Sequence, residues 1–262
     1  MRLDAFLAQR GMTPSRAKAK EMILSGCVWV DGREIRKPAW EVEGNNEVVL
    51  RQNPLQRYVS RGGLKLEVAL QAFALEVRGK VAVDIGSSSG GFTDCLLQHG
   101  AARVYAVDCG TAQLHPSLRE DARVCVMEQT NARMLNATSF PEPVDLAVMD
   151  VSFISQTLLY PAICTFLVPG GHLVSLIKPQ FEAGRGALNK SGVLQDAQLR
   201  AATLDHVLRT AQTYGLACLG HILSPITGGD GNVEYMALFR WSGVSSDIGV
   251  KEESAYIKEG GV

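Results

Sequence analysis

Short apolar runs alternate with amphipathic segments along most of this 262-residue chain. Runs of strand length predict β-strands near residues 81–85, 103–108, 123–127, 144–149, 172–177, 216–223 and 234–240. Apolar residues at helical spacing predict helices near residues 64–76, 92–99, 113–119, 155–167 and 195–214. This alternation predicts an α/β, Rossmann-like fold with a seven-stranded, mostly parallel sheet covered on both faces. A short glycine-rich segment joins the last two strands, so we expect that pair to be antiparallel.

The first 50 residues follow a different pattern and predict a small α/β domain of their own. Leu3 and Leu7 have helical spacing, and the pair Thr13-Pro14 is typical of the start of a second helix. The pair Asp31-Gly32 between short apolar stretches predicts a β-hairpin turn. We therefore expect a small domain over residues 1–50, a linker over 51–63, a larger domain over 64–242 and a disordered tail over 243–262.

The sequence VAVDIGSSSGGFTDCLLQHGAARVYAVDCG, residues 81–110, carries the most informative motif. A strand with Asp84 leads into a loop from Gly86 to Gly91, then into a helix and a second strand ending in Asp108. This order is typical of nucleoside sites in α/β sheets, where glycines let the backbone approach the ligand and the acid accepts from ribose hydroxyls. The loop differs from G-x-G-x-x-G, which favours S-adenosylmethionine and ranks a dinucleotide oxidoreductase last. An ordinary strand–helix turn remains the alternative.

Charged residues end two successive strands of the predicted sheet. Asp150 ends the run VDLAVMD, and Lys178 ends the run HLVSLIKP. Ligands of open α/β sheets bind outside the carboxyl ends of the strands, so both side chains are expected to face the cofactor. Glu234 opens the final strand at the same rim, and Lys65 lies on the helix that leads into the sheet. Taken singly, each of the four is more typical of a solvated surface charge.

Charge is unevenly distributed although the whole chain carries a net charge of only −1. Residues 1–65 hold 12 Lys and Arg against 7 Asp and Glu, whereas residues 66–262 hold 14 against 20. A basic small domain on an acidic body predicts a polyanionic partner that the small domain grips. Unequal charge between domains is also common without any such partner.

Several basic residues are candidates for contacts with the phosphates of RNA. The small domain contributes Arg2, Arg10, Arg16, Lys20, Arg33, Arg36 and Lys37. The linker adds Arg57 and Arg61 for backbone contacts and Tyr58 as a stacking surface for a base. For each single residue, plain solubilising charge is an equally good interpretation.

Cysteine usage and hydropathy indicate the compartment. The six cysteines are scattered without a C-x-x-C pair, which predicts reduced thiols and no metal site. The chain shows no secretory signal and no apolar stretch long enough to span a bilayer, so we expect a cytoplasmic protein. Residues 179–194 are rich in glycine and lack periodicity, which predicts a mobile loop over the site.

Two parts of the chain resemble known families. Residues 81–240, with the four charged residues above, resemble the FtsJ-like rRNA ribose methyltransferases, which are class I methyltransferases with a Lys-Asp-Lys-Glu tetrad. The sequences RLDAFLAQRG, SRAKAKEMI and GCVWVDG resemble the alpha-L RNA-binding domain. Joined by YVSRGGLKL, the two parts resemble the TlyA, or hemolysin A-like, family along nearly the whole chain. Members of that family are cytidine 2′-O-methyltransferases acting on 16S and 23S rRNA.

The resemblance implies roles for individual residues. The tetrad falls on Lys65, Asp150, Lys178 and Glu234. The methionine and ribose parts of the cofactor are expected beside Asp84, Gly86, Ser88, Gly90, Gly91 and Phe92, the ribose hydroxyls on Asp108 and the adenine beside Asn131. The family assigns deprotonation of the acceptor to Lys178, although neighbouring carboxylates favour a protonated lysine that would stabilise an alkoxide instead.

The resemblance also implies partners and leaves alternatives. We expect the protein to act on ribosomal RNA or ribosomal subunits as a monomer, without a membrane. A pore-forming hemolysin is the alternative that the family name suggests. A ribosome-assembly factor that keeps a cofactor pocket without catalysis is another alternative, which the intact tetrad disfavours.

Overall fold

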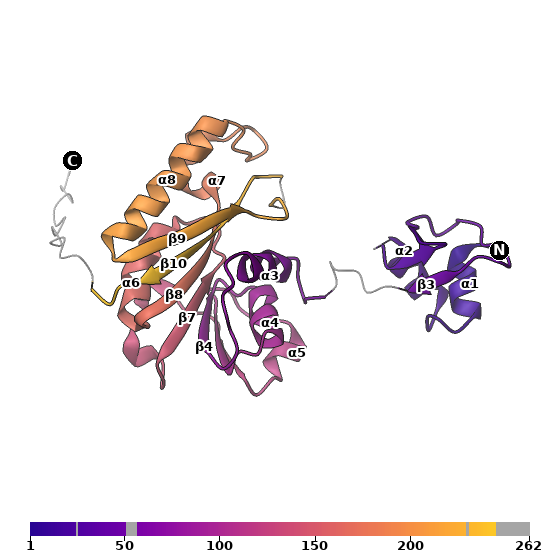
Figure 1. Cartoon of the computed structure of the whole chain (residues 1–262), viewed down its shortest axis with the longest axis horizontal. Coiled ribbons are helices and arrows are strands. Elements are labelled where there is room, and N and C mark those ends of the chain that lie inside the picture. Colours follow the sequence, from indigo (N-terminus) through magenta and orange to yellow (C-terminus); the bar gives the residue numbers. More distant parts are fainter. Residues whose placement is uncertain (25, 51–56, 229–230, 245–262) are drawn as a thin grey trace, which may run out of the picture.

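The computed structural model describes residues 1–24, 26–50, 57–228 and 231–244, which form two units (Figure 1). The small unit comprises the described residues up to 50, and the large unit comprises those from 57 onwards. Each unit has a hydrophobic core made from its own residues. The predicted linker segment 51–56 and tail residues 245–262 lie outside the described residues.

The small unit combines two helices with a three-stranded antiparallel sheet. Its elements are α1 (Leu3–Gln9), α2 (Arg16–Leu24), β1 (Val28–Val30), β2 (Arg33–Glu34) and β3 (Val48–Leu50), with strand order β2-β1-β3. Asp31 and Gly32 have φ values of 47° and 75°, the left-handed pair that a tight hairpin turn requires. The predicted small α/β domain and its hairpin are therefore confirmed.

The large unit is built on a seven-stranded sheet. Its strands are β4 (Val81–Ile85), β5 (Arg103–Val107), β6 (Val124–Met127), β7 (Val144–Met149), β8 (Leu167–Ile177), β9 (Leu216–Leu223) and β10 (Tyr235–Trp241). The order across the sheet is β6-β5-β4-β7-β8-β10-β9. The pairs from β6 to β8 are parallel, whereas β10 is antiparallel to both of its neighbours. The predicted mostly parallel sheet and its antiparallel final pair are confirmed.

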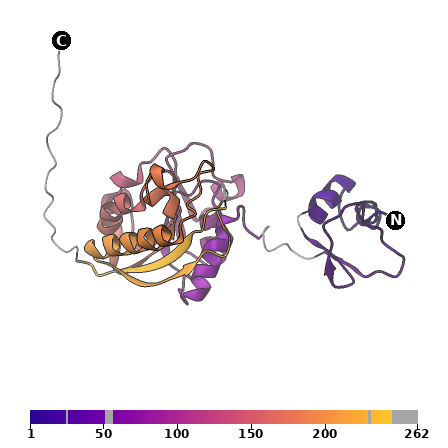
Figure 2. The ribbon, with the colours of Figure 1, turned by 90° about the horizontal axis from the view of Figure 1, so that it is seen from above.

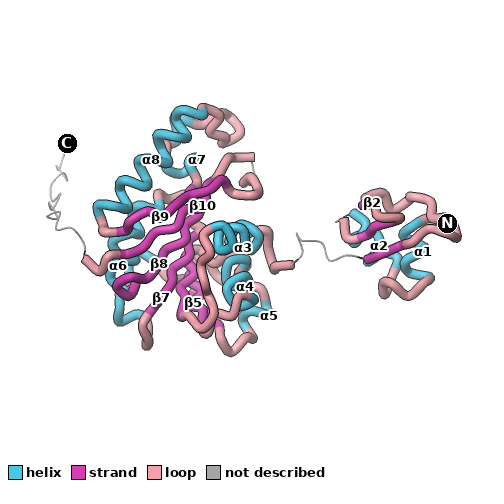
Figure 3. The backbone as a smooth tube through the Cα atoms, viewed as in Figure 1, coloured by secondary structure: helices cyan, strands magenta, loops and turns pink. Residues whose placement is uncertain are grey.

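Helices cover both faces of this sheet (Figure 3). The helices are α3 (Gly62–Ala72), α4 (Gly91–Gln98), α5 (Pro116–Arg119), α6 (Tyr160–Phe166), α7 (Pro179–Glu182) and α8 (Ala197–Thr213). Short 3-10 turns complete the unit: η2 (Ala132–Met134), η3 (Ala137–Ser139), η4 (Gln156–Leu159) and η5 (Arg185–Ala187). Apolar residues of α3, α4 and α5 pack in one core cluster, and those of α6 and α8 pack in another. Figure 2 shows α8 running alongside β9 and β10.

Proline positions account for two differences from the predicted helices. Pro116 and Pro161 both sit in the first turn of a helix, where the missing N–H costs nothing. The helix expected over 113–119 is therefore only α5, and the one expected over 155–167 divides into η4 and α6. In addition, β8 begins at Leu167 instead of residue 172.

The start of the large unit also differs from the prediction. Helix α3 begins at Gly62, inside the segment assigned to the linker. A Cβ on Gly63 would collide with the side chain of Tyr58, so the glycine lets the preceding segment pack against the helix. The division of the chain into domains at the other positions stays a prediction.

Candidate active site

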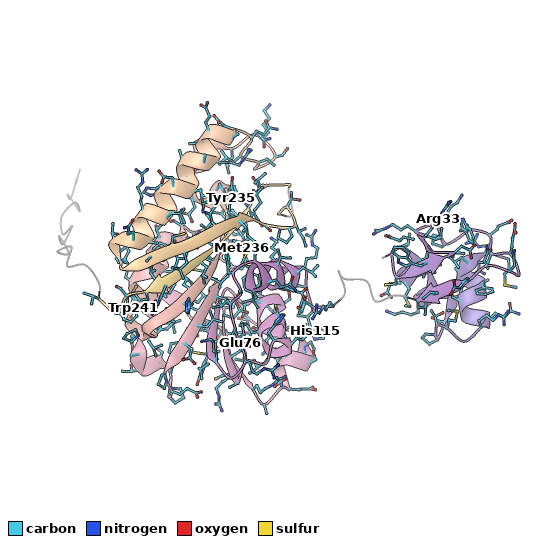
Figure 4. The ribbon with its side chains drawn as sticks, viewed as in Figure 1. Arg33, Glu76, His115, Tyr235, Met236 and Trp241 are labelled. Atoms are coloured by element: carbon cyan, nitrogen blue, oxygen red, sulfur yellow. The ribbon has the colours of Figure 1, made fainter. Side chains whose placement is uncertain are left out.

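The carboxyl edge of the sheet brings the four predicted charged residues to one place. Lys65, Asp150 and Lys178 line a cavity of about 280 Å³. Glu234 reaches the same place from the start of β10, directly before Tyr235, which Figure 4 labels. Its Oε2 accepts a 2.5 Å hydrogen bond from the Lys65 ammonium. The expected gathering of these side chains is what the structure shows, while their catalytic role stays a prediction.

The four side chains form two ion pairs, Lys178 with Asp150 and Lys65 with Glu234, which differ in how deeply they are buried. Lys178 Nζ contacts the Asp150 carboxylate and donates a 2.9 Å hydrogen bond to the Ser152 hydroxyl. The Lys65–Glu234 pair is deeper, with Glu234 only 3% exposed. Because a buried charge without a partner costs several kcal/mol, on the order of 3–5, each lysine needs the carboxylate beside it. The pairs thus keep two ammonium groups beside the cavity.

Residues of the glycine loop, including Gly86 and Gly91, line this cavity. Gly86 has a φ of 81°, and a Cβ there would collide with the backbone oxygen of Asp150. Gly91 faces the Ser60 hydroxyl with no room for a side chain. Gly90, also a predicted cofactor residue, lines neither of the cavities described here, and its φ of 95° serves the start of α4. Phe92 is buried and lines the cavity, while its contact with the cofactor stays a prediction.

A second cavity of about 410 Å³ lies beyond the loop. Asp108 and Asn131 are on its wall with apolar side chains such as Leu159. Asp108 accepts 2.8 Å and 2.7 Å hydrogen bonds from the backbone N–H groups of Ser88 and Gly110, which fix its carboxylate. Asn131 caps η2 by accepting from the Arg133 N–H.

The two cavities form one elongated site. Gly86, Ser88, Asp150 and Ser152 line both of them. The apolar walls and the fixed carboxylate of the second cavity suit an adenosine, and the polar first cavity suits a charged amino-acid end. The residues present therefore fit S-adenosylmethionine.

Asp84, a predicted cofactor residue, lies in β4 before the glycine loop and lines neither cavity. The residue is fully buried, and its Oδ2 accepts a 2.6 Å hydrogen bond from the Thr93 hydroxyl. Its Oδ1 has no hydrogen-bond partner among the described residues. Burial raises the pKa of this carboxyl to about 7, and the charges of Asp150 and Asp108 add to the rise. Asp84 thus titrates near neutral pH under the cofactor loop.

The segment between the units contributes differently from the prediction. Tyr58 is only 5% exposed, so it cannot offer the predicted stacking surface for a base. Arg57 forms an ion pair with Glu67 on α3. Arg61 lines the first cavity at the start of α3, where it is available to an anionic group. Of the three linker candidates, Tyr58 is therefore corrected to a packing residue.

The basic candidates of the small unit lie on its surface. Figure 4 shows Arg33 pointing away from the unit. The other basic candidates are also exposed: Arg2, Arg10, Arg16, Lys20, Arg36 and Lys37. Arg36 pairs with Glu34, while Arg2 and Arg16 share Asp4. RNA binding by these residues stays a prediction.

Residues not found from the sequence also line the site. Ser152 is a hydrogen-bond acceptor for Lys178. Phe153 lines the second cavity with 91% of its surface exposed and a φ of 64°, and its ring lies 5.0 Å from that of Phe181. Gln180 is buried and donates to Glu234 at 3.5 Å. The sequences VSF and PQF directly after Asp150 and Lys178 were the available signal.

Comparison with protein families and solved structures identifies the two units. The profile of FtsJ-like methyltransferases matches residues 58–241, and that of the S4 domain matches residues 1–48. A fibrillarin pre-rRNA processing protein from Methanococcus jannaschii shares the fold at a TM-score of 0.53 and 14% identity, over 78% of this chain and 82% of its own. The sheet, the joined cavities and the family match define a class I methyltransferase.

Relatives match almost the full chain. The 16S/23S rRNA (cytidine-2′-O)-methyltransferase TlyA of Mycobacterium tuberculosis is 44% identical over 94% of this chain and 91% of its own length. Hemolysin A of Brachyspira hyodysenteriae is 43% identical over 91% and 99%. A hemolysin-named structure from Streptococcus thermophilus aligns at a TM-score of 0.71 with 42% identity, over 92% and 88%. The chain belongs to the TlyA family of FtsJ-like methyltransferases, and its cofactor is S-adenosylmethionine.

Two further observations concern membranes and metals. Within the part of the chain that the structure describes, no helix combines the length and the apolar character needed to cross a bilayer. Among the same residues, no group of three or more His, Cys, Asp and Glu side chains is arranged to hold a metal ion.

Cofactor affinity is expected to rise with pH through the titration of Asp84. Near pH 6 this carboxyl is mostly neutral, and near pH 8 it is mostly ionised, because its pKa is about 7. A cationic cofactor favours the ionised form, and a bound-state pKa one unit lower makes affinity at pH 8 about fivefold higher than at pH 6. Calorimetry in buffers of different ionisation enthalpy measures both the affinity and the released proton. Asp84→Asn removes this pH dependence, and an unchanged profile in that variant would refute the prediction.

Proposed function

We propose that this protein transfers a methyl group from S-adenosylmethionine to the 2′ hydroxyl of a cytidine ribose in ribosomal RNA. The two lysine–carboxylate pairs support this proposal best, because Lys65, Asp150 and Lys178 line the first cavity and Asp150 also lines the second. The names of the TlyA relatives supply the nucleotide and the class of RNA. The S4 domain at residues 1–48 supplies a module for binding RNA.

The nucleophile in this reaction is a ribose hydroxyl, which is a very weak acid and does not lose its proton readily. S-adenosylmethionine supplies a methyl group on a positively charged sulfur, which leaves with the electron pair of the broken carbon–sulfur bond. The ribose oxygen forms the new carbon–oxygen bond and loses its proton. The protein must therefore align this oxygen with the methyl carbon and stabilise its negative charge as the proton leaves.

Lys178 is the residue that acts on the acceptor oxygen. Its contacts with Asp150 and Ser152 fix the ammonium group at the cavity wall. An ammonium has three N–H bonds, so a third remains for the ribose oxygen. In this role Lys178 stabilises the developing alkoxide, and a neutral Lys178 would accept the proton directly. Both roles require Lys178 at this position, and they are separated by the Lys178→Arg variant described in the Discussion.

The second pair holds the acceptor nucleotide. Lys65 is anchored by Glu234, which in turn accepts from Gln180. Lys65 donates to one carboxylate oxygen of Glu234, and Gln180 donates to the other, so the carboxylate is held in place and limits the motion of the lysine. The remaining N–H bonds of Lys65 are available to the ribose or its phosphate. Phe153, exposed at the mouth beside Phe181, offers a ring face on which the cytosine base can stack.

The remaining features concern the substrate and the state of the protein. The basic side chains of the small unit hold the surrounding phosphates, and the large unit carries the chemistry. We propose that the protein acts as a monomer in the cytoplasm, where ribosomal RNA and its subunits are found. We propose that residues 179–194, which include α7 and η5, cover the site. Asn232, which lies outside this segment, accepts a hydrogen bond from the Leu194 N–H and donates one to the Gly192 oxygen.

Methyl incorporation tests the proposed function. Purified protein is incubated with ribosomal subunits and cofactor labelled on the methyl group, and the product RNA is cleaved with alkali. A 2′-O-methyl group blocks this cleavage, so the modified cytidine appears as a protected position that carries label. Substrate with 2′-deoxycytidine at that position is the control, because it keeps the base and lacks the oxygen. Label at a base atom, or no label at all, would overturn the proposal.

The same preparation discriminates the alternatives. A ribosome-assembly factor without catalysis binds the subunits and the cofactor but incorporates no label. A pore-forming protein releases a dye from lipid vesicles at the concentrations used for methylation, without any need for the cofactor. We expect incorporation and no dye release.

A further inference from the structure

Asp4 is a buried acid at the centre of a cluster of basic residues in the small unit. It lies in the first turn of α1 with only 4% of its side chain exposed. Arg2 donates to its two carboxylate oxygens at 3.2 Å and 2.9 Å. Arg16, from the start of α2, places its Nε 3.3 Å from the carboxylate. One acid thus joins two arginines that come from different elements.

The arginines remain accessible although their anchor is buried. The side chains of Arg2 and Arg16 are 50% and 58% exposed. The hydrogen bond from Arg2, followed by the charge and hydrogen bond of Arg16, lowers the pKa of Asp4 to about 2 against the opposing effect of burial. The carboxylate is therefore ionised at neutral pH. Two guanidinium groups and one carboxylate leave a net charge of +1 for a ligand.

The backbone places other basic residues beside this cluster. The Asp4 N–H donates to the Pro38 oxygen at 3.1 Å, so the loop that carries Lys37 lies against the start of α1. Lys20 follows Arg16 by one turn of α2. Two arginines therefore contact the buried acid, and the backbone places two exposed lysines near them, which is the charge pattern expected for a polyanion.

Anchoring changes what the two arginines can do. A free arginine loses side-chain entropy when a ligand immobilises it. The Nε atoms of Arg2 and Arg16 already contact Asp4 in the folded protein, so these side chains lose less entropy when they bind a ligand. The outer N–H groups of a guanidinium fork match the oxygens of a phosphate. Both forks are held on the same carboxylate, with more than half of the Arg16 side chain and half of the Arg2 side chain exposed.

We propose that Asp4 is a positioning residue that holds Arg2 and Arg16 as a single binding unit for a phosphate of the RNA backbone. The inference rests on the proposed function, since it takes RNA as the substrate. Asp4 itself does not contact the RNA. It acts through the two arginines, and its negative charge would by itself repel a phosphate.

Positioning of the arginines and repulsion of the phosphate by Asp4 predict opposite changes in RNA affinity when Asp4 is replaced. Asp4→Asn removes one negative charge and keeps the shape of the side chain. If Asp4 positions the arginines, the variant binds a ribosomal RNA fragment about tenfold more weakly, and the slope of log affinity against log salt decreases by about one. If charge alone matters, the same variant binds more tightly. Full-length protein and filter binding at several salt concentrations provide the measurement.

The matched control replaces another acidic residue of the small unit, Glu21, which is not paired with Arg2 or Arg16. Glu21 is exposed on α2 and forms an ion pair with Lys18, at 2.7 Å. We expect Glu21→Gln to bind the fragment as tightly as the original protein or more tightly. An equal loss of affinity in both variants would overturn the proposal.

A second set of variants leaves Asp4 intact, in case its replacement unfolds the small unit. Arg2→Gln and Arg16→Gln change only half-exposed side chains. If the two arginines act as one unit, the double variant loses less affinity than the sum of the single losses in free energy. Additive losses would contradict the proposal. Methyl incorporation by the original protein is measured in parallel, because its absence counts against the proposed function and not against the phosphate-binding unit.

Discussion

Lys178→Ala is expected to lower the rate of methyl transfer to RNA by about 10²- to 10⁴-fold, the range typical of a lost acid–base or charge-stabilising group. The ammonium group of Lys178 is the one held at the cavity wall by both Asp150 and Ser152. Removing it leaves the acceptor oxygen without a partner as its proton departs. Single-turnover transfer of a labelled methyl group measures this step without product release.

Cofactor affinity separates this effect from damage to the site. Lys178 lines the first cavity but not the second, which has Asp108 and Asn131 on its wall and suits the adenosine part of the cofactor. The positive charge of Lys178 is paired with Asp150. We therefore expect Lys178→Ala to bind the cofactor within about twofold of the original affinity, as for a residue whose contact is made only in the transition state. Lys80→Ala, at the opposite edge of the sheet just before β4, is the matched control and keeps the full rate. A normal rate in Lys178→Ala would exclude the assignment.

The variant Lys178→Arg distinguishes the two roles of the lysine. A guanidinium keeps the positive charge but cannot act as a base, because it does not lose its proton in proteins. Partial activity in this variant indicates stabilisation of the alkoxide. Activity as low as that of Lys178→Ala, with cofactor and RNA affinity retained, indicates proton transfer to Lys178.

The sequence located the charged residues of the site because sheet geometry is regular. Asp150 and Lys178 each end a buried apolar run, and the carboxyl ends of neighbouring parallel strands β7 and β8 meet at one edge. Glu234 was predictable for a different reason. Antiparallel pairing of β10 with β8 sets Tyr235 opposite Ile177, so the residues that flank this pair, Glu234 and Lys178, come to the same rim.

Other parts of the site depended on contacts that no periodicity encodes. Tyr58 follows an arginine and precedes a glycine pair, a context that resembles an exposed linker. It is buried only because Gly63, on the helix that follows, leaves room for its ring. Phe153 is the opposite case, since an aromatic residue next to an apolar strand predicts burial. Its positive φ instead turns the ring towards solvent at the mouth of the site.

The anchoring of basic side chains could not be read from charge counts either. Asp4 is one of seven acids in residues 1–65, and the sequence does not distinguish it from the others. Folding brings α2 against α1, and Arg16 then reaches the acid of the other helix. The pattern of charge predicted a basic surface, whereas its internal organisation arises from helix packing.

Deleting residues 1–50 is expected to abolish methylation of ribosomal RNA while cofactor binding stays measurable. The small unit has its own core, formed by Leu3, Leu7, Ile23 and their neighbours up to Leu50. The two core clusters of the large unit begin at Tyr58. Because each core is complete without the other unit, the truncated chain is expected to fold and to keep both cavities. It loses the basic side chains that we propose to hold the RNA, so the substrate is expected to occupy the site too rarely for methylation.

Three measurements on the truncated protein decide between explanations. Calorimetry with S-adenosylmethionine should give an affinity within about twofold of the full chain, since an intact pocket preserves its contacts. RNA binding should be weaker by about 10²-fold or more, with a smaller dependence on salt, because phosphate contacts have been removed. Methylation should reappear in part at low salt and high RNA concentration, where weak binding suffices. Full activity under ordinary conditions would show that the large unit recognises its RNA alone. Loss of cofactor binding would show instead that the small unit supports the pocket, and the proposed division of labour between the two units would then fail.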